Sequence, residues 1–205
     1  MSTRNDKLKD LQEHTPTIFA PNCWGTFTYH HLGLEFRSPF ITMFINHDEY
    51  LRFLSDPKYY MSQELKLKEM YIDENYEKPF PVGMLGDDVS LWMNHYKSFE
   101  EAKECWERRK KRIDWDNLFV MFWDEKPENV KKFMSLPFER KICMVPYETD
   151  EPGVISVPYR EKEELKKYPF WEMVNNIALG KFALYDEVEL LHDGKFVKVG
   201  NLERK

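Results

Sequence analysis

Several side chains that can do chemistry lie close together near the start of the chain. An amide, a thiol, an indole and two imidazoles occur within ten residues: Asn22, Cys23, Trp24, His30 and His31. The apolar residues 18–20 just before them are typical of a buried strand. Because thiols and imidazoles are common nucleophiles and proton carriers, we expect one wall of a functional site here.

Cys23, His95 and Asp124 could form a nucleophile, a base and an orienting carboxylate. Each is expected just after a strand, and in open α/β sheets ligands bind at the carboxyl ends of the strands. Such a triad makes a thiolate at neutral pH and could transfer an acyl or other group. Two alternatives stay open, because a free cysteine is often a small buried apolar residue and a histidine is often hydrogen-bonded into the core.

Six side chains form the predicted substrate-binding set: Asn22, Trp24, His30, His31, Arg37 and Lys97. Trp24, which we expect in a loop, could stack on the apolar face of a sugar ring while Asn22 hydrogen-bonds to it. Arg37 could bind a phosphate or carboxylate through two hydrogen bonds, or form an ordinary salt bridge. A sugar or nucleotide sugar is therefore the expected ligand.

No metal ion or other cofactor is expected. The adjacent residues His30 and His31 would point in different directions on a regular strand or helix. Asp114-Trp115-Asp116 matches the Asp-x-Asp pattern with which some glycosyltransferases hold a divalent ion. We expect it between a helix and the start of a strand, however, which is the wrong end of the sheet. The sequence also has no Gly-x-Gly-x-x-Gly or phosphate-loop motif.

The composition limits the class of protein. A chain of 205 residues is long enough for one sizeable domain with a small annex. The net charge of −6, with both signs interspersed, argues against a nucleic-acid-binding protein. No segment approaches the roughly 20 apolar residues of a membrane span. The three cysteines are far apart and no hydrophobic signal segment is visible, so we expect a cytoplasmic protein.

The middle of the chain has the pattern of an α/β fold. Ser98 and Glu101 form a capping box that predicts the start of a helix. The apolar residues 118–123 suit a strand buried on both faces, Pro127 can begin the next helix, and residues 141–145 form another strand. This succession predicts a partly parallel sheet with flanking helices, which is the α/β class.

The two ends of the chain differ from this middle. Residues 1–15 are polar and predict a tail or a frayed helix, whereas residues 16–146 form the α/β core domain. Residues 147–205 predict a C-terminal annex packed on the core, with a helix over residues 163–178. The dipeptide Asp193-Gly194 is a strong hairpin signal, so the annex is expected to contain a β-hairpin there.

Two segments carry a resemblance to a known family: Asn22-Cys23-Trp24-Gly25 and His95-Tyr96-Lys97-Ser98-Phe99-Glu100-Glu101-Ala102. They are similar to the signature of a bacterial domain of unknown function labelled exopolysaccharide biosynthesis protein. The resemblance covers most of residues 17–146. It implies a capsule or exopolysaccharide context without specifying a reaction.

Together these observations favour a cytoplasmic transferase of surface-polysaccharide synthesis, which would move a glycosyl or small modifying group. The resemblance supplies the context, and the polar side chains at the expected strand ends supply the site. Two alternatives remain. One is a carbohydrate or nucleotide-sugar binding module without catalysis, and the other is an assembly partner that docks on a polysaccharide enzyme.

Overall fold

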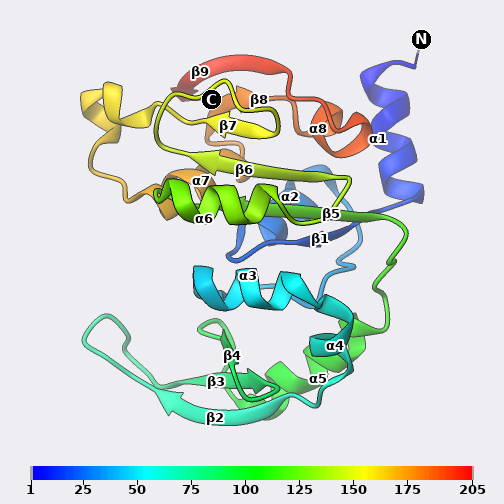
Figure 1. The fold of residues 1–205 in the computed structure, drawn as a ribbon, viewed down its shortest axis with the longest axis vertical. Coiled ribbons are helices and arrows are strands. Elements are labelled where there is room, and N and C mark those ends of the chain that lie inside the picture. The colour runs from blue at the N-terminus through cyan, green and yellow to red at the C-terminus, as the bar shows by residue number, and fades with distance from the viewer. Residues whose placement is uncertain (1, 205) are drawn as a thin grey trace.

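A parallel sheet of four strands forms the middle of the computed structural model, which describes residues 2–204 (Figure 1). In spatial order the strands are β1 (Thr17–Phe19), β5 (Leu118–Trp123), β6 (Lys141–Val145) and β7 (Val154–Ser156). Each strand pairs in parallel with its neighbour, so all four carboxyl ends lie at one edge. The predicted α/β class with a parallel sheet is confirmed.

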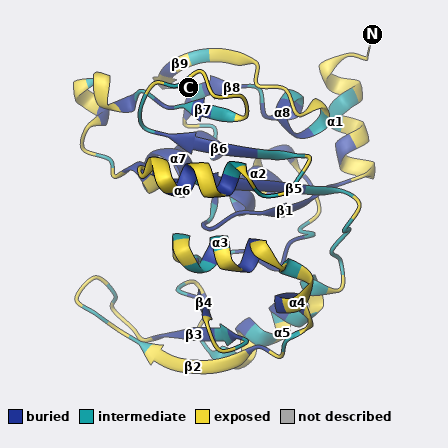
Figure 2. Cartoon of the chain, viewed as in Figure 1, coloured by how far each residue is buried: buried dark blue, intermediate teal, exposed yellow. Residues whose placement is uncertain are grey.

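The central strand β5 is apolar throughout because both of its faces are covered. Phe119 and Met121 belong to one hydrophobic cluster, whereas Val120 and Phe122 belong to another. This alternation follows from the two-residue period of a strand. Figure 2 shows the central strands as largely buried. The continuous apolar run in the sequence therefore reflects a sheet with two covered faces.

Helices α2 (Trp24–Leu32) and α7 (Phe170–Ala178) pack together over the first face of the sheet. Two short 3-10 turns precede α7: η1 (Tyr159–Glu161) and η2 (Glu163–Leu165). The sequence predicted one helix over residues 163–178, and that prediction is wrong for its first half. Pro169 stands directly before α7, and a proline has no N–H with which to continue a helix through its position.

The second face carries α3 (His47–Ser55) and α6 (Pro127–Met134), and a smaller sheet lies beyond α3 (Figure 1). This antiparallel sheet has the order β2 (Lys66–Tyr71), β3 (Phe80–Leu85) and β4 (Val89–Trp92), with α4 (Pro57–Ser62) and α5 (Phe99–Lys110) beside it. As predicted, the Ser98 side chain caps α5 and Pro127 is the first residue of α6.

The C-terminal segment contains a helix and an antiparallel strand pair, as predicted, but in a different order. Strand β8 (Phe182–Tyr185) pairs with β9 (Lys198–Arg204), and α8 (Glu187–Asp193) lies between them. The hairpin turn expected at Asp193-Gly194 is therefore wrong. Gly194 instead ends α8 with a left-handed backbone (φ 66°), a conformation that both hairpin turns and helix ends use. Strand β7, which we expected outside the core domain, is part of the main sheet.

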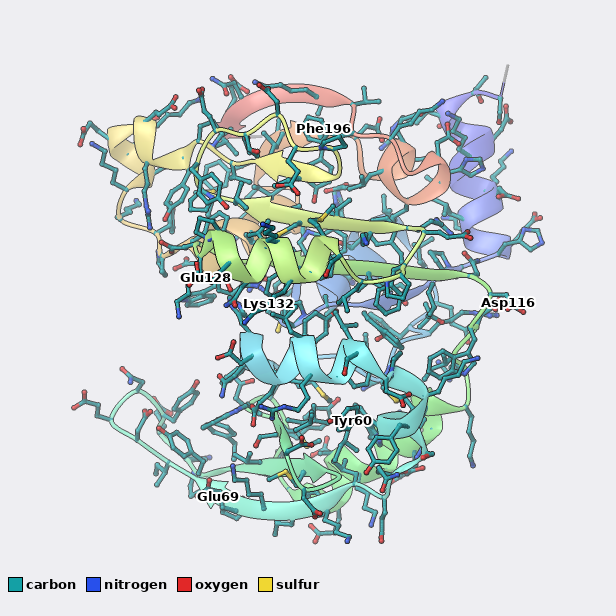
Figure 3. The ribbon with its side chains drawn as sticks, in the orientation of Figure 1. Tyr60, Glu69, Asp116, Glu128, Lys132 and Phe196 are labelled. Carbon is teal, nitrogen blue, oxygen red and sulfur yellow. The ribbon has the colours of Figure 1, made fainter. Side chains whose placement is uncertain are left out.

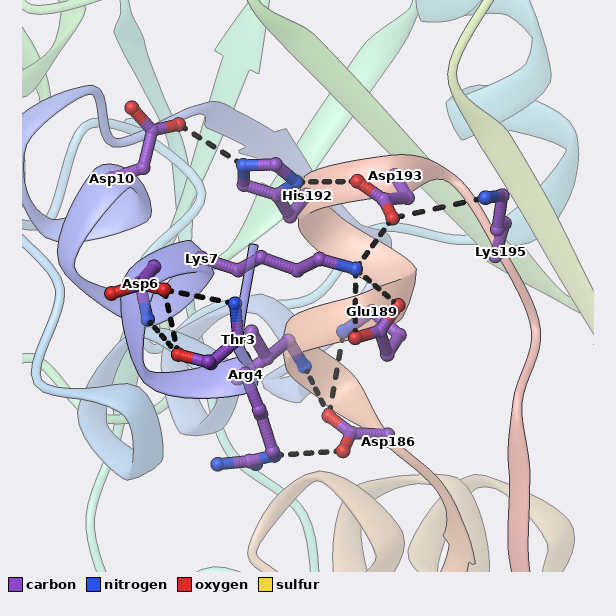
Figure 4. A network of polar contacts seen from close by, with 11 residues as sticks. Thr3, Arg4, Asp6, Lys7, Asp10, Asp186, Glu189, His192, Asp193 and Lys195 are labelled. Atoms are coloured by element: carbon purple, nitrogen blue, oxygen red, sulfur yellow. Dashed lines mark hydrogen bonds and ion pairs between the residues drawn. The ribbon is translucent and has the colours of Figure 1, made fainter. Parts of the chain in front are cut away.

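The N-terminal residues form a docked helix rather than a tail. Helix α1 (Arg4–Glu13) begins with a capping box between Thr3 and Asp6. Figure 4 shows it lying along α8, where Lys7 contacts both Glu189 and Asp193 at 2.7 Å. The apolar content of α1 is low, so its position depends on these contacts and on the buried side chain of Leu11.

The aromatic packing around α3 gives a first prediction. The Phe53 ring is fully buried and lies within 5.5 Å of the rings of Phe19 and Phe40. Phe53→Ala is expected to lower the free energy of unfolding by about 3–5 kcal/mol, because it leaves a cavity between the two sheets. Urea unfolding measures this change. Leu51→Ala, on the same helix but only partly buried, is the control and should cost about 1 kcal/mol. Equal losses for the two variants would contradict this packing.

Candidate functional site

Polar residues from separate parts of the chain meet at the carboxyl edge of the main sheet. Phe19, the last residue of β1, pairs with Val120, three residues before the end of β5, so both strands end towards this edge. The segment that leads into α3 joins the same edge, because the Ile45 amide donates to the Pro21 carbonyl at 2.9 Å. His47, the first residue of α3, is thereby brought towards Asp124, which follows β5.

Asp124 is a buried carboxylate with three hydrogen-bond donors. Its Oδ2 atom accepts from His47 Nδ1 at 2.9 Å and from Asn129 Nδ2 at 2.8 Å, and its Oδ1 atom accepts from the Lys126 amide at 2.9 Å. Burial alone would raise the pKa of Asp124, but these hydrogen bonds outweigh it and lower the pKa below its usual value. The carboxylate therefore stays ionised at neutral pH.

The His47 ring is held in one orientation by this carboxylate and by two aromatic rings. The ring lies 5.1 Å from Phe122 and 4.2 Å from Trp123, centroid to centroid. Its side chain is 23% exposed, against 5% for Asp124. Within the described part of the chain, Nε2 makes no hydrogen bond. When Nδ1 donates to Asp124, the neutral ring carries its lone pair on Nε2, which is the arrangement of a general base.

Cys23 and His95 also lie together, but Asp124 does not join them. The Sγ atom of Cys23 is 3.9 Å from Nε2 of His95. Burial raises the pKa of the Cys23 thiol to about 11, and burial lowers the pKa of His95. Both groups are therefore neutral at pH 7. The predicted triad is wrong in its third member, because Asp124 is bound to His47 instead.

Three buried polar atoms near this edge have no hydrogen-bond partner among residues 2–204. They are Asn22 Nδ2, Asn94 Oδ1 and Trp123 Nε1. Asn22 follows β1, Trp123 ends β5, and Asn94 lies next to His95. An unpaired buried polar atom is costly, so each invites an explanation such as a bound ligand. A polar ligand at this edge would supply the missing partners.

Trp24 does not fulfil the predicted role. It is the first residue of α2 rather than part of a loop, and its side chain is fully buried. Its ring stacks on Phe119, and its Nε1 atom donates to the Tyr185 hydroxyl at 3.1 Å. Gly25 lets α2 approach β1, since a Cβ there would lie 3.2 Å from Ile18. The indole is thus part of the core and is closed to a sugar.

The two adjacent histidines lie in the last turn of α2 and belong to another surface. His31 Nδ1 is 3.0 Å from a carboxylate oxygen of Glu187, and its ring packs on Gly180. His30 is exposed.

Within residues 2–204, no group of three or more His, Cys, Asp or Glu side chains is arranged to hold a metal ion. Among the same residues, no helix combines the length and apolar character needed to cross a membrane.

Arg37 lies at the opposite end of the sheet. It pairs with Glu35 at 3.1 Å and lines a cavity of about 550 Å³ together with Asp114 and Asp116. Figure 3 labels Asp116 on the side where β5 begins, far from Glu128 at the start of α6. The Asp-x-Asp segment thus joins a helix to a strand, as expected. Lys97 is exposed, and its backbone amide donates to Glu101 at the start of α5.

A groove borders the candidate site on the side of Trp123. Its volume is about 480 Å³, and it is lined by Trp123, Glu125, Tyr159, Arg160, Lys166, Lys167, Tyr168, Pro169, Phe170 and Trp171. The Trp123 ring lies between His47, at 4.2 Å, and Phe170, at 5.7 Å. Aromatic and cationic side chains therefore gather next to the His47–Asp124 pair.

Sequence reasoning missed His47, Asn129 and this groove. His47 is the first residue of α3, but it is 77 residues away from Asp124 in the sequence. Asn129 lies in the first turn of α6, five residues after Asp124, where a helix expected to begin at Pro127 would have placed it near that carboxylate. That short spacing is the one signal that could have been used.

The sequence model of a family described as Domain of unknown function (DUF1919) matches residues 2–191. The chain belongs to this family. An uncharacterized protein of Haemophilus influenzae is 34% identical to it over 137 residues, which is 65% of this chain and 63% of that protein. The chain thus spans less than two thirds of that relative. The predicted resemblance to a domain of unknown function is confirmed, and the polysaccharide context stays a prediction for this DUF1919 protein.

The neutral state of Cys23 gives a second prediction. With a pKa of about 11, only about 0.1% of the thiol is ionised at pH 8, so alkylation by iodoacetamide should be slow. The rate should rise about tenfold per pH unit up to pH 10. Peptide mass spectrometry follows the labelling, with the half-buried Cys105 as an internal comparison. Fast labelling at pH 7 that is lost in His95→Ala would contradict this account.

Proposed function

We propose that this DUF1919 protein is a transferase of surface-polysaccharide synthesis in which His47 is the general base. The observation that carries the proposal is the 2.9 Å hydrogen bond from His47 Nδ1 to the buried Asp124 carboxylate, with Nε2 left unbonded among residues 2–204. The transferred unit is a glycosyl or small modifying group. The proposal includes a cytoplasmic location, which the three free cysteines support.

In the proposed reaction, a hydroxyl of the acceptor donates its proton to His47 Nε2 as its oxygen attacks the donor. The new bond joins the acceptor oxygen to the transferred group, and the leaving group departs with its bonding electron pair. Asp124 stabilises the imidazolium that forms. The N–H donors of Asn22 and Trp123 have no partner among residues 2–204, and each is buried, so a reactant oxygen reaches them only if the surrounding side chains move. General-base catalysis of this kind contributes about 10²–10⁴ to a rate.

The groove and the family resemblance both support a sugar as the substrate. The groove beside His47 has aromatic walls at Trp123, Tyr159 and Trp171, and aromatic rings pack well on the apolar faces of sugars. The resemblance of residues 22–25 and 95–102 to a family with an exopolysaccharide label supplies the biological context. Cys23 has no part in the proposed chemistry because its thiol is protonated.

A binding module without catalysis is the second candidate. The unpaired buried atoms of Asn22, Asn94 and Trp123 favour it as well, because they suit ligand binding whether or not a reaction follows. The two candidates differ in one respect. A transferase turns over its donor through His47, whereas a binding module holds the ligand unchanged.

Donor turnover by the full chain tests the proposal. Nucleotide release is measured with a panel of nucleotide sugars and sugar acceptors. His47→Ala is expected to lower kcat/KM by about 10²–10⁴, and Asp124→Asn should also lower it because the ring loses its orienting carboxylate.

His14→Ala, which removes an exposed histidine at the C-cap of α1, is the matched control and should keep the wild-type rate. Cys23→Ser should remain within about threefold of it, since a neutral thiol contributes no nucleophile. Full activity of His47→Ala would contradict the proposal. Ligand binding without turnover in the wild-type protein would favour the binding module.

A further inference from the structure

We propose that the groove beside His47 binds the diphosphate of an activated sugar, with Lys166 and Lys167 near the phosphate oxygens and the exposed Trp171 ring against the organic part. This inference names the donor class of the proposed transferase and rests on that function. The shared chemistry is a sugar joined through its anomeric carbon to a diphosphate. Such a group occurs in soluble nucleotide sugars and in lipid-linked sugars.

The groove has more positive than negative charge along its lining. Among the described residues that line it, Arg160, Lys166 and Lys167 are the cations and Glu125 is the one carboxylate. Within residues 2–204, Lys167 pairs with no carboxylate, and its Nζ atom lies 5.1 Å from the centre of the Tyr168 ring. A polyanion would therefore find at least one cation without a competing partner.

The ion pairs of the other two cations are exposed, and Arg160 also donates to the Tyr159 hydroxyl at 3.1 Å and lies over that ring. Arg160 contacts Glu125 at 2.7 Å, and the two side chains are 54% and 43% exposed. Lys166 pairs with Glu163, whose side chain is 84% exposed. Exposed pairs of this kind contribute little to stability, so both cations can exchange a carboxylate for a phosphate at small cost. Arginine also matches phosphate geometry with two parallel hydrogen bonds.

The start of α7 adds a second reason to expect an anion. Its N-cap residue is Pro169, which makes no side-chain hydrogen bond to the first turn. The first residues of the helix, Phe170 and Trp171, line the groove. Unpaired amides at a helix N-terminus and the helix dipole both favour a negative group. The cations of the groove and the helix end thus favour the same kind of ligand.

The aromatic residues of the groove differ in burial: some are part of the core, and one is exposed. Tyr159 and Phe170 stack on each other at 5.7 Å and are buried, so they form a fixed floor. Trp171 is 50% exposed, and no ring contact of its side chain occurs within residues 2–204. An exposed indole beside cations suits a sugar ring or a nucleobase. Trp123 connects this groove to His47, so a bound donor would end beside the general base.

Two other cavities fit a diphosphate less well. In the cavity at the amino end of the sheet, Arg37 and Arg112 both contact Glu35, and Asp114 and Asp116 add negative charge. A larger cavity, of about 820 Å³, borders β7 and Lys198 of β9 and includes three acidic residues of the loop that precedes β7. The groove at α7 therefore offers the best match for an anionic sugar.

Calorimetric titration of the full chain tests the assignment with four probes: UDP-glucose, a farnesyl-diphosphate-linked glucose, inorganic pyrophosphate and glucose. We expect UDP-glucose or the lipid-linked sugar to bind, pyrophosphate to bind more weakly, and glucose to bind weakest. Whichever of the two sugar diphosphates binds more tightly identifies the source of the donor. Failure of all three diphosphates to bind, or equal affinity for glucose, would overturn the assignment.

Variants locate the binding in the groove. The double variant Lys166→Gln/Lys167→Gln is expected to weaken binding of the preferred diphosphate at least about tenfold, because two phosphate partners are lost. The matched control Lys66→Gln/Lys78→Gln removes two exposed lysines, one on β2 and one in the loop between β2 and β3, and should stay within about twofold. Trp171→Ala should weaken binding about fivefold, whereas Phe196→Ala, which truncates an aromatic side chain that is 45% exposed, should not. Wild-type affinity in both groove variants would overturn the proposal.

One further variant separates this inference from the proposed function. His47→Gln should bind the diphosphate with wild-type affinity, because His47 is not part of the groove lining. Normal binding together with unchanged turnover in that variant would refute the general base and leave the groove assignment intact. If His47→Gln loses turnover but the wild-type protein binds no diphosphate, the general base is supported and the groove assignment is refuted.

Discussion

The buried carboxylate of Asp124 constrains the whole carboxyl edge of the sheet. A buried charge is very costly unless hydrogen bonds replace its water, and here the donors come from three places in the chain. They are the first residue of α3, the first turn of α6 and the backbone just after β5. Helix α3 is fixed in turn because the Tyr50 hydroxyl donates to the Met121 carbonyl of β5 at 3.1 Å. The packing between the two sheets thus positions the His47 ring.

Much of the central fold could be predicted because its signals are local. A six-residue apolar run indicated β5, Pro127 indicated the start of α6, and Ser98 indicated the start of α5. The ends of the chain were harder because their structure depends on distant partners. Helix α1 is polar, and ion pairs with α8 hold it in place. Gly194 has the left-handed backbone that a hairpin also uses, so the local sequence alone did not distinguish a helix end from a turn.

The sequence predicted where polar side chains gather, but not how they pair. The rule that ligands gather at strand ends placed Cys23, His95 and Asp124 in one site, but Cys23 lies 3.9 Å from His95 while Asp124 pairs with His47. The same rule could not predict His47, because this residue does not follow a strand of the main sheet. His47 lies in the long segment between β1 and β5, and the hydrogen bond between Ile45 and Pro21 brings that segment to the edge. The burial of Trp24 was also not predictable, because a tryptophan that follows a strand has the same local sequence whether its side chain is exposed or buried.

The tautomer of the His47 ring is the most direct test of this account. Long-range proton–nitrogen NMR of the imidazole side chains reports which ring nitrogen carries the proton, and the His47→Ala variant assigns the signal. At a pH where the ring is neutral, the account predicts a proton on Nδ1 and a bare Nε2, because the Asp124 carboxylate accepts from Nδ1. A neutral ring with its proton on Nε2 would contradict the proposed general base.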